Sequence, residues 1–260
     1  MRSVSFDAAP VRERDDGGAI GRVRVRDYFG RGHQIEPGPQ AYIGEQLEAG
    51  SELFAHFHDV DQFQVVVFGT GRFGRHRVAP VTVQYADAFS TYGPIVADDG
   101  GLGYFVLRRC AATGGWRMPE YAHLAEGAVG RRFFVAPTDL DRRPATGQAE
   151  REGLWGPADD GLEVAVLRLG ANAQATPPPA GCGAQYLLVS AGALVQDGMA
   201  LGVNAVLLQE ADEPPESVTA GPEGAVLLVL RLPMSSQRRG SDPAHVQGRA
   251  GEYVRAVNSV

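Results

Sequence analysis

The segment spanning residues 50–69, GSELFAHFHDVDQFQVVVFG, holds two histidines one residue apart, His56 and His58, and a glutamine, Gln62, shortly after them. Two imidazoles and a nearby oxygen donor can hold a divalent metal from one side and leave positions open for a ligand. A carboxylate would normally complete such a group, and here an amide takes its place. Gln62 is therefore either a weak, neutral ligand, which leaves the metal a stronger Lewis acid, or a hydrogen-bonding residue beside a metal held by the two histidines and water.

The spacing of these residues requires two strands joined by a tight turn. In a β-strand, residues two apart point to the same face, so His56 and His58 would project together from one strand. Asp59 and Asp61 are of the type that turns favour, and Gln62 would then begin the return strand beside the histidines.

The rest of the chain has the sequence pattern of an all-β protein. Short apolar runs rich in Val, Tyr and Phe, bounded by Gly, Pro and Asp, are typical of the strands of a barrel or sandwich. One segment, residues 118–127 (MPEYAHLAEG), has a proline near its start and a glycine at its end and predicts a short helix. The segment RRFFVAP, residues 131–137, predicts one more strand.

The chain also matches itself when it is shifted by 123 residues. Gln62 falls on Gln185, and the spacing Q-x6-G is preserved in both copies. The tripeptide Val-Leu-Arg at 106–108 recurs at 229–231. A constant offset without insertion predicts two copies of one barrel. The expected domains are an N-terminal arm (1–37), a first barrel (38–111), a connector with a short helix (112–155), a second barrel (156–235) and a polar C-terminal tail (236–260).

Written as a pattern, the first copy reads Gly50-x5-His56-x-His58-x3-Gln62-x6-Gly69. This resembles the first conserved motif of the cupin superfamily, G-x5-H-x-H-x3/4-E-x6-G, with glutamine at the glutamate position. Because the resemblance covers both copies, it implies a bicupin, in which two double-stranded β-helix (jelly-roll) barrels follow one another with a short helical connector. It also implies a divalent transition metal ion (Fe, Mn, Ni, Zn or Cu) with His56, His58 and Gln62 as its ligands.

The second cupin motif, G-x5-P-x-G-x2-H-x3-N, is present only in outline. Gly74 and Pro80 fit, but Tyr85 stands at the histidine position, and a slip of one residue would place Gln84 there instead. A tyrosine whose pKa is lowered by a metal could act as a general base, so Tyr85 is the expected catalytic residue. The alternative is a barrel tyrosine whose hydroxyl is bonded to a neighbour.

Three further residues are expected to line the site and bind substrate. Asp87 would share the face of Tyr85 and could restore the missing carboxylate. Tyr92 precedes a Gly-Pro turn that would lie at the mouth of the barrel, and Gln64 could line the interior. The alternative for Tyr92 is a packed aromatic residue beside a turn.

The second copy lacks the metal ligands. Pro179 and Gly181 stand where the first copy has its histidines, and Leu208 stands where it has Tyr85, although Gln185 remains. This barrel is expected to be structural.

The composition argues against several classes of function. All 24 basic residues are arginine, which excludes Schiff-base chemistry and a phosphate-binding loop built on lysine. A net charge of −7 without a basic stripe argues against nucleic acid as a partner. No apolar run reaches the roughly 20 residues that span a bilayer. The N-terminus lacks the features of a secretory signal, and the two cysteines form no disulfide framework, so a cytoplasmic protein without membrane contact is expected.

Three kinds of function remain open. The first is a metal-dependent enzyme of the dioxygenase, isomerase or lyase type, acting on a small, anionic organic molecule in the N-terminal barrel. The second is a non-catalytic small-molecule-binding protein, and the third is a structural protein with a decayed metal site. The expected partner is a small-molecule ligand or substrate, and the chain is expected to be a monomer or a homodimer.

Overall fold

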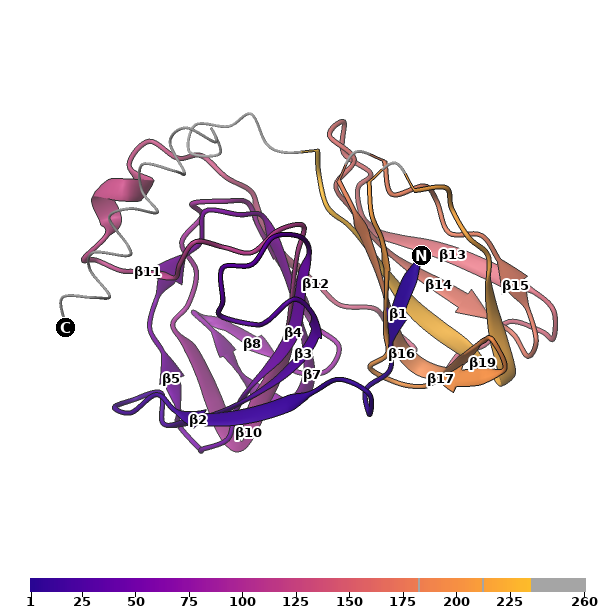
Figure 1. Cartoon of the computed structure of the whole chain (residues 1–260), viewed down its shortest axis with the longest axis horizontal. Coiled ribbons are helices and arrows are strands. Elements are labelled where there is room, and N and C mark those ends of the chain that lie inside the picture. Colours follow the sequence, from indigo (N-terminus) through magenta and orange to yellow (C-terminus); the bar gives the residue numbers. More distant parts are fainter. Residues whose placement is uncertain (182, 212, 235–260) are drawn as a thin grey trace. The chain divides into compact units, whose positions relative to one another are not determined.

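The computed structural model describes residues 1–181, 183–211 and 213–234. The predicted polar tail, 236–260, lies outside the described residues, as does Cys182. The regular secondary structure of the described residues is almost entirely β-strand, which confirms the predicted all-β class. Figure 1 shows the strands gathered in two bodies.

The strands form two compact units. We call them the N-barrel (residues 10–134) and the C-barrel (residues 1–9 and 135–234). These units divide the chain differently from the boundaries expected from sequence. The expected N-terminal arm is split, because residues 1–9 add a strand to the C-barrel and the following residues carry two strands of the N-barrel. The expected connector is also divided, at residue 134.

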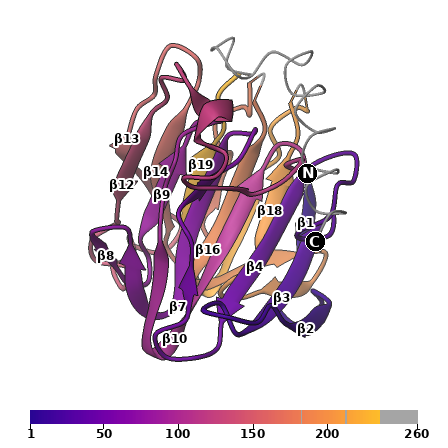
Figure 2. The ribbon, with the colours of Figure 1, turned by 90° about the vertical axis from the view of Figure 1, so that its left-hand side faces the viewer.

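The N-barrel contains a nine-stranded sheet with the order β12-β9-β7-β10-β4-β3-β2, while β5 pairs with β10 and β8 pairs with β7. A separate pair joins β6 to β11. Figure 2 shows β10 between β7 and β4. The bounds are β2 (Val11–Asp15), β3 (Arg22–Phe29), β4 (Gln40–Gln46), β5 (Glu52–Leu53), β6 (His56–Phe57), β7 (Gln62–Phe73), β8 (His76–Val78), β9 (Val83–Ala86), β10 (Ile95–Arg108), β11 (Trp116–Arg117) and β12 (Arg132–Val135).

The C-barrel contains an eight-stranded sheet with the order β1-β18-β16-β19-β14-β13, while β15 pairs with β19 and β17 pairs with β16. The bounds are β1 (Arg2–Val4), β13 (Ala149–Trp155), β14 (Glu163–Leu169), β15 (Gln174–Ala175), β16 (Gln185–Gln196), β17 (Met199–Leu201), β18 (Val206–Gln209) and β19 (Val218–Arg231).

The strand bounds confirm the repeat at an offset of 123 residues. In each of the pairs β4/β14, β7/β16, β9/β18 and β10/β19, both ends of the second strand are displaced from those of the first by this offset. The pairing is repeated as well. Arg108 on β10 lies opposite Gln62 on one side and Gln40 on the other, and Arg231 on β19 lies opposite Gln185 and Glu163. The two barrels are therefore two copies of one fold, residue for residue along these strands.

The glycine that ends the Q-x6-G spacing has a structural reason in both copies. Gly69 and Gly192 have φ angles of 63° and 69°, and a Cβ atom there would collide with the carbonyl oxygen of Gly101 or Gly224 on the neighbouring strand. Only glycine combines this conformation with such a close approach. The glycine marks the irregular region where β10 and β19 change register against their partners.

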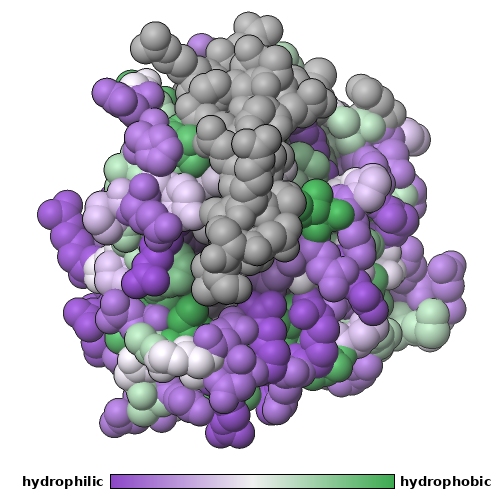
Figure 3. Space-filling view, turned by 60° about the vertical axis from the view of Figure 1, so that its left-hand side comes forward, coloured by the Kyte–Doolittle hydropathy of each residue, from purple (hydrophilic) through white to green (hydrophobic). Residues whose placement is uncertain are grey.

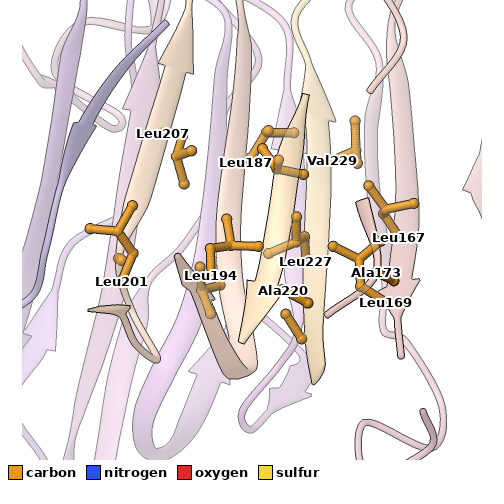
Figure 4. Close-up of a cluster of buried hydrophobic side chains, with 14 of the residues drawn as sticks. Leu167, Leu169, Ala173, Leu187, Leu194, Leu201, Leu207, Ala220, Leu227 and Val229 are labelled. Atoms are coloured by element: carbon orange, nitrogen blue, oxygen red, sulfur yellow. The ribbon is translucent and has the colours of Figure 1, made fainter. Parts of the chain in front are cut away.

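The interiors of the two barrels differ in polarity. The C-barrel is filled by buried aliphatic side chains, and Figure 4 shows them between its strands. At five of the equivalent positions the N-barrel carries a smaller, polar or aromatic residue in place of leucine. Gly44, Gln46, Gln64, Gln84 and Tyr104 correspond respectively to Leu167, Leu169, Leu187, Leu207 and Leu227. The C-barrel thus has a packed hydrophobic core. In the N-barrel, the side chains at these positions leave room for a polar cavity.

The helix expected at 118–127 is only one 3-10 turn, η1 (Ala122–Ala125). Its Leu124 packs with Phe57 and Trp116 in a small cluster, so the segment is fixed by burial of a few side chains. The predicted strand at 131–137 is present as β12. Among the described residues, no helix is long and apolar enough to cross a membrane. The face of the molecule in Figure 3 is mostly hydrophilic, with hydrophobic residues scattered among polar ones.

Candidate functional site

The N-barrel contains a cavity of about 220 Å³. Four of the residues predicted from sequence line it, namely His56, His58, Gln64 and Tyr92. Arg108 lines it as well. The remaining lining residues are Arg14, Asp16, Ile20, Val23, His33, Tyr42, Gly44, Glu45, Gln46, Leu53, Phe54, Tyr104, Val106 and Gly115. The cavity therefore brings together three histidines, two arginines and three tyrosines.

His56 begins β6, and His58 directly follows its last residue. The backbone of His56 exchanges two hydrogen bonds of 2.9 Å with the backbone of Tyr92, and β6 pairs with β11 on its other side. The rings of His56 and His58 lie with their centroids 5.1 Å apart and their planes nearly perpendicular. The predicted pair is thus brought together at the cavity wall.

Hydrogen bonds to backbone carbonyl groups select one tautomer of each histidine. Nδ1 of His56 lies 2.8 Å from the carbonyl oxygen of Phe54, and Nδ1 of His58 lies 2.5 Å from that of Gly114. A carbonyl oxygen can only accept, so each Nδ1 carries a proton and each Nε2 keeps its lone pair. Histidines that ligate metals are held in the same way.

The electrostatic surroundings keep both imidazoles neutral. Burial lowers the pKa of His56 to about 4, an effect that the Phe54 carbonyl opposes and Arg108 strengthens. Burial, with the charge of Arg108, also holds the pKa of His58 well below its ordinary value. At neutral pH both rings are therefore in the neutral form that a metal requires.

Space beside the two rings is provided by Gly115. A Cβ atom at this position would lie 3.4 Å from Cε1 of His58 and 3.9 Å from Cδ2 of His56. Both carbons are bonded to Nε2, so Gly115 lies close to the edges of the rings that carry the lone pairs. The absence of a side chain here keeps these edges open to the cavity.

Gln62 is held at both ends of its amide. Its Oε1 accepts a hydrogen bond of 2.9 Å from Nε of Arg108, and its Nε2 donates one of 2.5 Å to the hydroxyl of Tyr92. A guanidinium group can only donate, so the amide orientation is fixed. This arrangement corresponds to the second role expected for Gln62, that of a hydrogen-bonding residue. Gln62 is not among the residues that line the cavity.

Tyr92 presents its hydroxyl at the cavity wall. Its ring lies 4.5 Å from that of His56, centroid to centroid. Burial raises the pKa of Tyr92 above its ordinary value, so the phenol is protonated at neutral pH. Because its oxygen accepts from Gln62, its own proton is available to an acceptor elsewhere.

Two of the predicted site residues, Tyr85 and Asp87, do not line the cavity, which corrects the expectation that they face a ligand. On β9, Tyr85 lies opposite Phe63, whereas Gln84 lies opposite Gln64. Tyr85 therefore points to the other face of the sheet, where its hydroxyl donates to Asp87 at 2.6 Å. Successive residues of a strand alternate between faces, so a shift of one residue exchanges Gln84 and Tyr85.

Asp87 is occupied in a network outside the cavity. It forms an ion pair of 3.0 Å with Arg131 and also accepts from the backbone nitrogen of the same residue. The burial of Tyr85, together with the nearby carboxylates of Asp61 and Asp87, raises the pKa of its phenol far above the ordinary value. A tyrosine in these surroundings is a poor general base, and its bond to Asp87 gives it a structural role.

Several lining residues were not predicted from the sequence. They include Arg108, Gly115, His33, Tyr42 and Tyr104. One signal was present for Arg108, because the tripeptide Val-Leu-Arg that contains it recurs in the second copy. Tyr42 and Tyr104 are separated from the histidine motif along the chain, and only the folding of β4 and β10 brings them to it.

The donor set at the cavity is small. Among the described residues, no three or more His, Cys, Asp or Glu side chains gather into a group that could hold a metal ion. The two carboxylates that line the cavity are both in ion pairs, Asp16 with Arg14 at 2.7 Å and Glu45 with Arg24 at 3.3 Å. The histidine pair, together with neutral oxygen donors, is therefore what the cavity offers to a metal.

Comparison with known proteins shows which solved structures share this fold. No protein-family model matches the chain, and no curated protein matches it in sequence. Solved structures do match over most of its length. A cupin 2 conserved barrel domain protein from Leptotrichia buccalis is 12% identical, with a TM-score of 0.50 over 89% of this chain and 96% of its own. The chain has the cupin fold.

Two further solved structures resemble this chain. A candidate dioxygenase from Nostoc punctiforme is 12% identical, with a TM-score of 0.58 over 88% of this chain and 81% of its own. A bacterial pirin from Escherichia coli, solved in complex with nickel(II), is 14% identical, with a TM-score of 0.55 over 89% of this chain and 99% of its own. These similarities extend across both barrels, because each covers nearly nine tenths of the chain.

Proposed function

We propose that the N-barrel is the functional half of this bicupin, and that His56 and His58 hold a divalent transition metal ion beside a cavity for a small organic anion. The observation that carries the proposal is the pair of hydrogen bonds from Nδ1 to backbone carbonyl oxygens, which leaves two Nε2 lone pairs on neighbouring rings. The open space at Gly115 supports it, because a metal needs room at these ring edges.

The proposed reaction is of the dioxygenase, isomerase or lyase type. A bound metal would act as a Lewis acid towards an oxygen of the substrate. The residues of the chain supply the rest. Arg108 attracts and orients an anionic group, the phenol of Tyr92 can donate a proton into the cavity, and Tyr42, Tyr104 and Val106 limit the entry of water. Solved metal-binding and dioxygenase-named cupins of similar fold are consistent with this chemistry.

A second candidate function is binding without turnover. It is favoured by the lack, among the described residues, of a third histidine or a carboxylate gathered with the pair. In that case a metal would anchor the ligand and Tyr92 would only donate a hydrogen bond to it.

Metal content of the purified protein tests the proposal. We expect a near-stoichiometric amount of Fe, Mn, Ni, Zn or Cu after anaerobic reconstitution, and its loss in the double variant His56→Ala/His58→Ala. His123→Ala is the matched control, because His123 is exposed and is not among the residues lining the cavity. Failure of the unmodified protein to bind any of these metals would contradict the proposal. For a metal-loaded protein, oxygen uptake or loss of substrate in a panel of small organic acids separates the enzyme from the binder.

A further inference from the structure

We propose that Gln64, with Gln84 beside it, recognises a hydroxyl group of the ligand in the N-barrel cavity. Gln64 is 2% exposed and lines the cavity. Gln84 lies directly opposite it, on the neighbouring strand β9, and is 1% exposed. Residues directly opposite each other in an antiparallel pair share one face of the sheet, so both side chains point to the interior of the barrel.

The amides of these two residues are left without partners by the protein. Oε1 of Gln64 and both amide atoms of Gln84 have no hydrogen-bond partner within the described part of the chain. Two neighbouring glutamines are instead held in place. Gln62 is bonded at both ends of its amide, and Nε2 of Gln46 donates to the carbonyl oxygen of Ser51 at 2.9 Å. Burying an amide without a partner costs free energy, which a ligand that bonds to the amide would recover.

The C-barrel shows that the fold does not need amides at these two positions. Leu187 and Leu207 are the equivalents of Gln64 and Gln84 at the offset of 123 residues, and they too lie opposite each other. Both leucines are buried in the hydrophobic core of the C-barrel. A leucine pair thus packs on the equivalent strands in the same register. The amide pair is therefore a property of the N-barrel and of the cavity that this barrel contains.

The neighbours of the pair indicate which kind of group it can bind. Val106 on β10 lies opposite Gln64 on one side and opposite Tyr42 on the other, and all three line the cavity. This row across the sheet contains no carboxylate, guanidinium or imidazole, so an uncharged polar group meets the smaller desolvation cost here. An amide offers both a donor and an acceptor, and a hydroxyl can donate and accept at once. A hydroxyl group therefore matches the pair.

The volume of the cavity limits the rest of the ligand. An engineered apolar cavity of about 150 Å³ accommodates benzene. At about 220 Å³, the cavity here accommodates one ring, or a short chain, that carries the hydroxyl group. This inference rests on the proposed function for the use of the same cavity, but it depends neither on a bound metal nor on the charge of the ligand.

Pairs of ligands in which a methyl group replaces a hydroxyl group test the inference. Calorimetry on the metal-free protein would compare phenol with toluene, and 5-hydroxypentanoate with hexanoate. We expect the hydroxyl member of at least one pair to bind about tenfold or more tightly than its methyl partner, because the amides stay unpaired beside a methyl group. The first pair measures the preference without an anionic group, and the second measures it with one.

The double variant Gln64→Leu/Gln84→Leu gives the N-barrel the residues of the C-barrel. It should abolish the preference for the hydroxyl group. The midpoint of thermal unfolding should stay the same or rise, because the orphaned atoms of the pair make no hydrogen bond to described residues that could be lost. A purely structural role would instead lower the midpoint and leave the preference intact. The reciprocal control, Leu187→Gln, should lower the midpoint and leave the preference unchanged, since it buries an amide among aliphatic side chains.

Three results would overturn the inference: no member of either pair binds, neither hydroxyl compound binds better than its methyl partner, or the folded double variant keeps the preference. If the double variant does not fold, Gln64→Leu alone takes its place. Metal content measured in parallel keeps the two proposals distinct. A hydroxyl preference without metal binding would contradict the proposed metal site alone, and metal binding without this preference would contradict the role of Gln64 alone.

Discussion

At the scale of residues, the chemistry of the site depends on which atom of each side chain is already engaged. The carbonyl groups of Phe54 and Gly114 engage Nδ1 of the two histidines, so their Nε2 atoms remain for a ligand. Arg108 and Tyr92 engage both ends of Gln62, so its amide becomes a link between a cation and a phenol. Hydrogen-bond direction, more than residue type, therefore separates the groups that can meet a ligand from those that support them.

Gly115 gives a prediction at this scale. Gly115→Ala should retain metal binding, because its Cβ would lie at ordinary van der Waals distances of 3.4 and 3.9 Å from the two rings. Gly115→Leu should lower metal affinity by about tenfold or more, since its larger side chain would fill the space at the ring edges. Metal titration of both variants checks this. Equal affinities for the two folded variants would mean that the metal does not bind at these edges.

At the scale of elements, the register of β9 determines which side chains reach the interior. The strand pairs with β7 so that Gln84 faces Gln64 and Tyr85 faces Phe63. Tyr85 then packs against Phe133, at 5.4 Å between ring centroids, and bonds to Asp87. One face of this strand thus builds the interior, and the other face ties β9 to the segment around Arg131.

This register predicts the effect of removing the Tyr85 hydroxyl. Tyr85→Phe should lower the free energy of unfolding by about 1–3 kcal/mol, because a buried hydrogen bond to a carboxylate is lost. It should leave metal content and ligand affinity unchanged. Tyr92→Phe, the matched variant on the cavity side, should instead alter ligand affinity. Chemical denaturation and ligand titration of both variants distinguish them, and a loss of metal or ligand in Tyr85→Phe would restore the catalytic role first expected for it.

At the scale of the whole molecule, one fold appears twice with two different interiors. The strands of the two barrels correspond residue for residue, so the backbone does not explain why only the N-barrel has the polar site described here. The difference lies in five inward positions, which hold leucine in the C-barrel and glycine, glutamine or tyrosine in the N-barrel. We infer that the C-barrel contributes stability and the N-barrel contributes function.

The division of roles predicts opposite results for substitutions at equivalent positions. Leu227→Ala in the C-barrel should lower the free energy of unfolding by about 2–5 kcal/mol, because Leu227 is fully buried in its core. It should leave metal content unchanged. Tyr104→Ala, at the equivalent position of the N-barrel, should change ligand affinity. Denaturation and binding measurements on both variants check this, and an effect of Leu227→Ala on metal content in folded protein would contradict it.

The sequence by itself determined the features that depend on short spacings. The alternation of apolar residues predicts the strands, and the constant offset of 123 residues predicts the repeated barrel, because a strand and a repeat are both patterns along the chain. The placement of His56 and His58 together follows for the same reason, since two residues separated by one other lie on one face of a strand. The resemblance of the first copy to the cupin motif also depends on short spacings along the chain.

Only the tertiary structure decided what surrounds the histidines. Tyr42, Tyr104 and Gly115 reach the cavity from segments separated from the histidines along the chain, so no local spacing predicts them. The faces of Gln84 and Tyr85 depend on the register of β9 against β7, and a slip of one residue reverses them. The membership of residues 1–9 in the C-barrel depends likewise on the pairing of β1 with β18. Register and strand order are fixed by contacts between distant segments, which is why a pattern read along one strand could not predict them.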